Sequence, residues 1–157
     1  MFQPPSLQNE FSLVFSGDPA LALPDDPDNR TAKLRVAQET GVWRELLKPN
    51  ELPTLFRFRS IHGAPLTWLQ AETARKQRNQ EEGFELVFRL ALRGVDNLAN
   101  YQPTFVHQDG QRLLDHESLD FIYSLGRNLG MPLLGRSIVL ELAAIVLNRA
   151  VSGVPPK

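Results

Sequence analysis

The sequence contains no cysteine, and this absence excludes disulfides, thiolate nucleophiles and cysteine-based zinc sites together. Histidine is scarce as well, and His62, His107 and His116 show neither a ligand-like spacing nor an HExxH motif. The sequence therefore indicates no metal site, no cofactor and no catalytic residues, and we expect a protein that is not an enzyme. Folding can still gather distant carboxylates, which a sequence does not show.

Lysine is also rare, so arginine supplies most of the 17 basic residues. There are 18 acidic residues, and at a formal net charge of −1 no global field attracts the chain to nucleic acid or anionic lipid. Binding of that kind would need a local basic face, for which the candidates are Arg57, Arg59, Arg75, Lys76 and Arg78. The last three also suit the dipole at the end of a predicted helix, so nucleic-acid binding is not the favoured interpretation.

No stretch of the chain is apolar for long enough to cross a membrane. The most apolar segment, 131–151, is interrupted by Arg136, Glu141, Asn148 and Arg149, whereas a span needs roughly 18 residues with few or no charges. We predict a core helix there and no membrane association. The N-terminal sequence MFQPPSLQNEF has neither a basic nor an apolar region, so we expect no signal peptide.

The length of 157 residues suits one compact domain. The patterns described next predict an α+β fold that is mainly α, with about five helices, a short strand and a β-hairpin. Pro4 and Pro5 predict a flexible N-terminal arm over residues 1–10, and the ending VPPK predicts a C-terminal tail over 153–157. The domain itself is expected to cover residues 11–152.

Hydrophobic periodicity and turn residues predict the order of the elements. The clearest amphipathic signal lies at 81–98, and Asp109-Gly110 is typical of a hairpin turn because both residues accept positive φ. The expected elements are a strand at 11–15, a helix at 31–40 capped by Asn29 or Thr31 and ended by Gly41, a helical turn near Trp43, a strand within 53–63, a helix from Ala64, a helix at 81–98, a hairpin at 104–114, a helix from the cap Asp115 to Leu129, and a last helix at 133–151.

The strand segment PTLFRFRSIHG (residues 53–63) alternates aromatic and basic residues. Because successive side chains of a strand point to opposite faces, Phe56 and Phe58 share one face while Arg57 and Arg59 share the other. We expect the aromatic face to lie in the core and the arginine face to point outward, toward solvent or acidic partners.

Two motif-like patterns overlap before the last helix. Residues 130–137, GMPLLGRS, resemble the phosphate-binding pattern GxxxxGK(S/T), but arginine replaces the lysine and Pro132 removes one N–H. Residues 124–142 resemble a helix-turn-helix, yet the second helix offers mainly aliphatic side chains where base-reading polar ones are needed. We predict a turn between two helices, not a nucleotide or DNA site.

The last helix is apolar over most of its circumference and has only a narrow polar stripe. Such a helix lies either at the centre of the core or against a neighbouring subunit. Because few other long helices are expected to surround it, we favour an interface with a partner or with a second copy of the chain. The candidate interface residues are Ile138, Val139, Leu142, Ile145 and Val146.

The segment from residue 53 to about 129 combines PTLFRFRSIHG, a helix ending in RKQR, the apolar helix FELVFRLALRGVDNL, the QDGQRLLD turn and a helix starting at Ser118. In this order it resembles bacteriophage tail assembly chaperones. The resemblance implies a non-enzymatic morphogenesis protein that acts in the host cytoplasm and binds the tape-measure protein, tail-tube subunits or other virion subunits.

Two alternatives stay open. The long apolar last helix exceeds what a minimal chaperone needs, which also fits a tail, neck or baseplate subunit retained in the virion. From a different class, a small DNA-associated protein would use the basic face.

Overall fold

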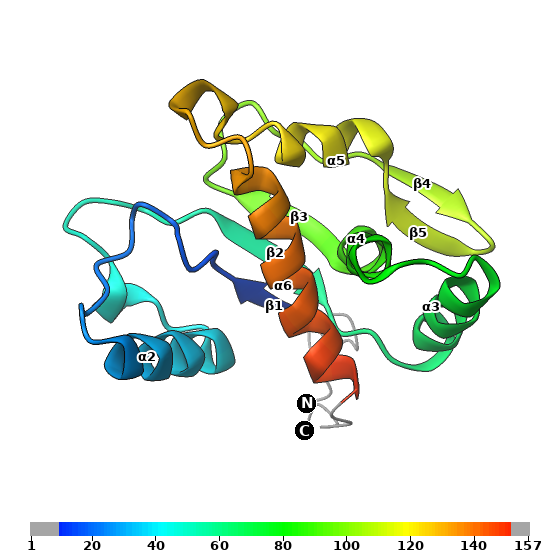
Figure 1. The fold of residues 1–157 in the computed structure, drawn as a ribbon, viewed down its shortest axis with the longest axis horizontal. Helices are drawn as coiled ribbons and strands as arrows, with labels where there is room; N and C mark the ends of the chain where they lie inside the picture. The colour runs from blue at the N-terminus through cyan, green and yellow to red at the C-terminus, as the bar shows by residue number, and fades with distance from the viewer. Residues whose placement is uncertain (1–9, 152–157) are drawn as a thin grey trace, which may run out of the picture.

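The computed structural model describes residues 10–151, whose helices and two small antiparallel sheets give the predicted α+β fold that is mainly helical (Figure 1). The predicted arm and tail lie outside the described residues, except that Glu10 begins the first strand. The elements are β1 (Glu10–Leu13), α2 (Pro27–Thr40), the 3-10 turn η1 (Arg44–Leu46), β2 (Leu55–Arg59), α3 (Gly63–Arg75), α4 (Gln80–Ala91), β3 (Leu92–Asp96), β4 (Phe105–Gln108), β5 (Gln111–Leu114), α5 (His116–Tyr123), the 3-10 turn η2 (Arg127–Leu129) and α6 (Leu134–Val151).

An antiparallel sheet in the order β1-β2-β3 lies under α6 (Figure 1). On its inner face Phe56 and Phe58 are 1% and 0% exposed, and the Phe58 ring meets Phe88 of α4 edge-on at 5.6 Å between centroids. Arg57 and Arg59 point to the outer face and are half-buried. The prediction drawn from the alternating pattern is confirmed.

The helix predicted at 81–98 is wrong in its second half, because α4 ends at Ala91 and the chain continues directly into β3. Pairing with β2 supplies hydrogen-bond partners that the amphipathic pattern does not reveal. Gly94 leaves room for the side chain of Arg57, which crosses over this position of β3. A Cβ at residue 94 would lie 2.8 Å from Cζ of Arg57. Val95 continues the helical period only by coincidence, since it faces Phe56 across the sheet.

The hairpin of β4 and β5 is confirmed, with φ of 52° at Asp109 and 78° at Gly110. Asp115 caps α5 as predicted, since its carboxylate accepts the backbone N–H of Ser118 at 2.8 Å. The helix ends at Tyr123 and not at Leu129, because Gly126 adopts a φ of 86° and turns the chain.

Helix α2 begins earlier than predicted, at Pro27, and its cap is Asp26 instead of Asn29 or Thr31. Proline is accepted in a first helical turn, because the N–H that it lacks would have no partner within the helix. Gly41 ends the helix as predicted, with a φ of 73°. The helix packs against a second, smaller apolar cluster formed by Val14, Leu21, Ala37, Trp43 and Leu46.

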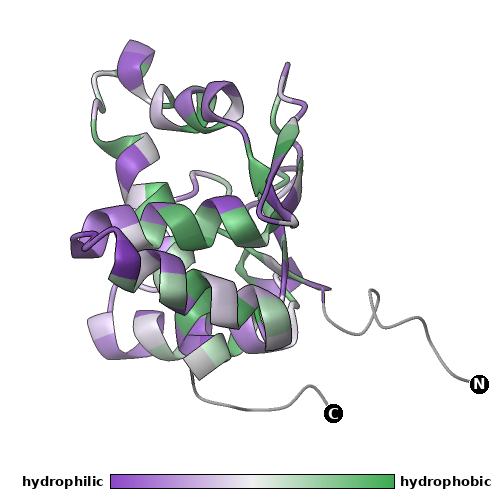
Figure 2. Cartoon of the chain, turned by 90° about the vertical axis from the view of Figure 1, so that its right-hand side faces the viewer, coloured by the Kyte–Doolittle hydropathy of each residue, from purple (hydrophilic) through white to green (hydrophobic). Residues whose placement is uncertain are grey.

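Helix α6 lies in the core of the chain itself. Val139 and Leu142 are 0% exposed, and they belong to a cluster that also contains residues of α4, α5 and the sheet. Figure 2 shows apolar colour concentrated where these helices and the sheet face one another. Of the residues predicted to contact a partner, the four that the core covers are Ile138, Val139, Leu142 and Val146, and Ile145 is half-buried. The predicted interface is therefore wrong. The prediction considered only the small number of long helices, whereas the sheet and α4 also cover these residues.

Asp115 is expected to stabilise the fold above acidic pH. Its carboxylate accepts hydrogen bonds from the Thr104 hydroxyl and the Ser118 N–H, and the first of these is the main reason why its pKa lies below the ordinary value of 3.8. Because the folded pKa is lower than the unfolded pKa, this stabilisation is present above the unfolded pKa and is lost as the pH falls through the folded pKa.

Changing Asp115 to alanine is expected to lower the free energy of unfolding by about 1 kcal/mol at neutral pH, the usual effect of losing a helix N-cap. In urea titrations the difference from wild type should shrink as the pH is lowered below about 4. Asp120→Ala is the control, since Asp120 is an exposed residue of the same helix and should matter little. A difference that is independent of pH would contradict the assignment.

Candidate protein-interaction surface

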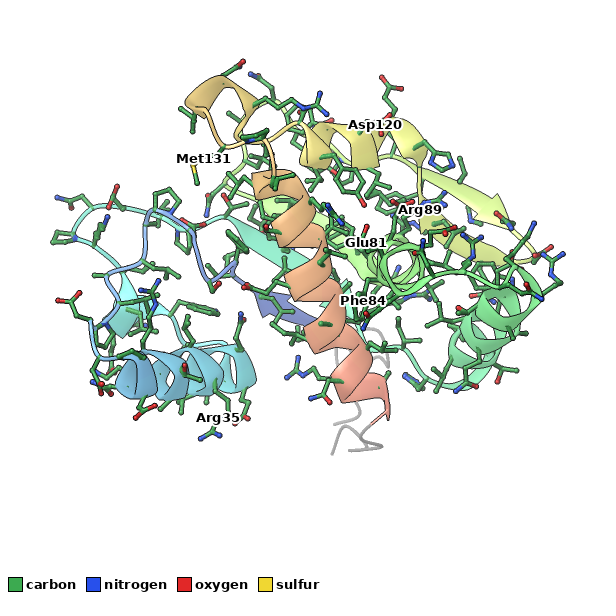
Figure 3. All side chains as sticks on the ribbon, in the orientation of Figure 1. Arg35, Glu81, Phe84, Arg89, Asp120 and Met131 are labelled. Atoms are coloured by element: carbon green, nitrogen blue, oxygen red, sulfur yellow. The ribbon has the colours of Figure 1, made fainter. Side chains whose placement is uncertain are left out.

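The most prominent exposed apolar surface is formed by residues 129–133, from the last residue of η2 to the residue before α6, here called the apolar loop (Figure 3). Leu129 is 76% exposed, Met131 50% and Leu133 63%. Single exposed apolar residues are common on proteins, but three large ones within five positions are typical of an interaction site.

A groove of about 470 Å³ opens beside the apolar loop. Phe15 and Gly17, from the turn after β1, form one side of it, and the apolar loop with the first turns of α6 forms the other. Its full lining is Phe15, Gly17, Met131, Pro132, Leu133, Leu134 and Ser137. Loop and groove together offer protruding apolar side chains next to an apolar depression, a shape that suits an apolar segment of another protein.

Backbone hydrogen bonds hold the apolar loop in place. The carbonyl oxygen of Gly126 accepts the N–H of Leu129 at 3.0 Å and that of Met131 at 2.9 Å. Gly126 and Gly130 both adopt positive φ, which lets the chain turn twice within five residues. A Cβ at Gly126 would lie 2.6 Å from the carbonyl oxygen of Met131, so only glycine fits. The exposed side chains are therefore displayed on an ordered backbone, which lowers the entropy cost of binding.

The opposite wall of the groove is fastened to α6 through Glu141. The Glu141 carboxylate accepts the backbone N–H of Ser16 at 2.8 Å and the Ser16 hydroxyl at 2.5 Å. These contacts join the turn after β1 to a helix more than a hundred residues later, so both walls of the groove belong to one rigid unit.

The predicted basic face is not one surface. Arg57 and Arg59 lie on the outer face of β2, whereas the other three residues, Arg75, Lys76 and Arg78, lie around the end of α3. Arg57 pairs with Asp96 at 3.1 Å.

Near the end of α3 a single carboxylate, that of Glu72, forms ion pairs with two of the three basic residues. Glu72, only 4% exposed at its side chain, pairs with Arg75 at 2.7 Å and with Arg78 at 3.7 Å. The hydrogen bond from Arg75 is the main reason why the pKa of Glu72 is lowered. Lys76 has no carboxylate within 4.0 Å among residues 10–151. Of the five residues of the candidate basic face, Arg57, Arg75 and Arg78 are therefore paired with carboxylates. Binding of nucleic acid by this face stays a prediction.

The remaining sequence patterns acquire structural explanations. The phosphate-loop-like segment 130–137 has Gly135 against the backbone of α5, and Arg136 pairs with Glu81. In the part of the chain that the structure describes, no three His, Asp or Glu side chains come together as a metal site. None of the described helices is long and apolar enough to span a membrane.

Comparison with protein families, with curated proteins and with solved structures found no match for this chain. Sequence reasoning missed Leu129 and Leu133 because it placed them at the ends of two predicted helices, and it missed Met131 because it treated residues 130–132 as a break between those helices. The available signal was the pattern of glycine and proline among large apolar residues in NLGMPLL, which cannot continue a helix and yet is not polar.

Proposed function

We propose that the protein is non-enzymatic and acts through protein–protein contacts made by the apolar loop and its groove. The observation that carries this proposal is the exposure of Leu129, Met131 and Leu133 beside an apolar depression. Burying such side chains on a partner gives about 25 cal/mol per Å² of apolar area removed from water, before the costs of association.

We further propose that the partner is an exposed apolar helix of a bacteriophage tail protein, either the tape measure or a tail-tube subunit. This part of the proposal is supported by the resemblance of residues 53–129 to tail assembly chaperones. The protein would act in the host cytoplasm during assembly. If it is instead a subunit retained in the virion, mass spectrometry of purified particles will recover it in stoichiometric amounts, which would overturn the chaperone proposal.

The test of the surface uses a double variant, Leu129→Ser with Leu133→Ser, in an aggregation assay with a purified tape-measure segment. Light scattering should show that the wild-type chain suppresses aggregation of the segment and that the double variant largely loses this activity. Because both residues are exposed, the free energy of unfolding should change by less than about 0.5 kcal/mol for each replacement.

The matched control is Leu52→Ser, because Leu52 is 72% exposed but lies outside the loop and groove. This variant should suppress aggregation as well as wild type. If the double variant also retains full activity, the apolar loop is not the contact surface. If the wild-type chain has no effect on any tail protein of the phage, the tail-assembly assignment is wrong.

A further inference from the structure

Three arginines, Arg59, Arg93 and Arg112, gather near one end of the larger sheet and are here called the arginine cluster. Across residues 10–151, no carboxylate oxygen lies within 4.0 Å of any of their guanidinium nitrogens. By contrast, Arg57, two residues before Arg59 on the same strand, is paired with Asp96. A concentration of positive charge without a counter-charge is unfavourable unless something other than the described residues supplies it.

Arg59 occupies the outer face of the central strand. Its Nε donates to the carbonyl oxygen of Leu90 at 3.0 Å, near the end of α4, and this bond fixes the direction of the guanidinium. The pKa of Arg59 is lowered by burial first, and then by the positive charges of Arg93 and Arg112. The positive charges of Arg93 and Arg112 thus both act on Arg59.

Arg93 is brought to this place by a β-bulge. Phe58 of β2 faces Leu92, and Arg57 faces Gly94, so Arg93 is the additional residue that has no partner across the ladder. Bulges of this kind redirect a side chain and are frequent beside functional sites. The Nε of Arg93 and the Nη2 of Arg59 are buried without a hydrogen-bond partner in the part of the chain that the structure describes.

Arg112 comes from the other sheet. Its guanidinium carbon lies 3.7 Å from the centroid of the Phe105 ring on the neighbouring strand, so the planar group is held flat on the aromatic face. This arrangement fixes the orientation of the guanidinium group. Arg112 is therefore pre-organised in the way that binding of an oxyanion requires.

The surrounding acidic residues do not neutralise the cluster. Glu10 faces Arg59 across the β1–β2 pair, but it is exposed and its carboxylate stays beyond 4.0 Å. Asp96 is engaged by Arg57. Among residues 10–151, no acidic side chain thus forms an ion pair with the arginine cluster, in a chain whose net charge is −1.

We propose that the arginine cluster binds a phosphate group. The guanidinium fork matches the oxygens of an oxyanion, and a phosphate dianion offers three groups of this charge more compensation than a single carboxylate does. The ligand would lie on the open side of the sheet, away from the faces that α4 and α6 cover. This inference is independent of the protein contacts proposed for the apolar loop.

The experiment is isothermal titration calorimetry of the full chain with inorganic phosphate. The ionic strength is kept constant by replacing chloride with phosphate. Wild type is expected to bind saturably at one site. Arg93→Gln and Arg112→Gln should each weaken the affinity by about tenfold, the usual loss for a charge-assisted hydrogen bond. Arg93→Lys, which keeps the charge but not the fork, should fall between wild type and Arg93→Gln.

Two controls separate the site from general charge. Arg35→Gln removes an exposed arginine of α2, far from the cluster (Figure 3), and Arg57→Gln removes the paired arginine of the same strand face; both should bind phosphate like wild type. In chloride buffer, the midpoint of thermal unfolding of Arg112→Gln should change little, because the replacement removes both repulsion within the cluster and the contact with the Phe105 ring. A marked fall would assign Arg112 a structural role and overturn the proposal.

A second series of titrations identifies the source of the phosphate. If a single-stranded oligonucleotide binds with the same dependence on Arg93 and Arg112, and more weakly as salt rises, the source is nucleic acid. If a nucleoside triphosphate or inorganic phosphate binds while the oligonucleotide does not, the source is a small molecule. Absence of saturable phosphate binding, or equal binding by Arg93→Gln and Arg35→Gln, would overturn the proposal.

Discussion

Replacing Leu142 by aspartate is expected to abolish the cooperative folded state. Leu142 is 0% exposed in the middle of α6 and belongs to the main hydrophobic cluster. A carboxylate at this position would have to be buried without a partner or be protonated, and either outcome costs several kcal/mol, comparable with the total stability of a domain of this size. Circular dichroism should show no unfolding transition, and Val139→Asp should behave in the same way.

The variant Leu142→Ala should still fold, so that its free energy of unfolding can be measured, unlike that of the aspartate variant. Removing the side chain is expected to lower the free energy of unfolding by about 2–5 kcal/mol in urea titrations. Ala144→Asp is the matched control, because Ala144 is exposed on the same helix, and it should change stability little. If Leu142→Asp gave a folded monomer in place of an oligomer, α6 would be an interface and not a core helix.

Replacing Gly135 by alanine is expected to be the second most damaging change. Gly135 lies in the first turn of α6 where the helix passes the end of α5, and a Cβ there would lie 2.6 Å from Cα of Tyr123 and would also overlap the carbonyl oxygen of Ile122. Both obstacles are backbone atoms, so no rotamer change can relieve the overlap. We expect the free energy of unfolding to fall by about 1–3 kcal/mol or more.

Gly83→Ala is the control for the Gly135 variant. Gly83 lies in the first turn of α4, and a Cβ there would meet no atom within 4 Å. Because alanine has the higher helix propensity, this variant should be as stable as wild type or more stable by up to about 1 kcal/mol. If Gly135→Ala were equally harmless, the two helices would not approach as closely as described. Thermal unfolding of the two variants side by side decides the question.

The residues that sequence reasoning placed correctly are those whose structure depends on near neighbours. The alternation of Phe56, Arg57, Phe58 and Arg59 divides the two faces of β2 because the period of a strand is two. Asp109-Gly110 and Gly41 turn the chain because they accept positive φ, and Asp115 caps α5 because its carboxylate reaches an N–H three residues later. These assignments need no knowledge of the rest of the fold.

The candidate sites depended on contacts that sequence reasoning could not supply. Four of the five residues assigned to a partner interface are covered by the core, while the exposed apolar surface lies in the preceding turn. Arg75 and Arg78 share Glu72 with each other, and Arg57 is paired with a carboxylate 39 positions later. Whether a basic side chain is paired with a carboxylate therefore depends on where the fold places a few acidic side chains.

By itself, the sequence determined which segments can be helix, strand or turn, and which face of each is apolar, because backbone preference and side-chain period act over a few residues. Only the tertiary structure decided that β3 follows α4 without a loop, that α6 is enclosed, and that no carboxylate of residues 10–151 lies within 4.0 Å of the guanidinium nitrogens of Arg59, Arg93 or Arg112. The physical reason is that burial and charge compensation are properties of neighbours in space, and these neighbours come from distant parts of the chain.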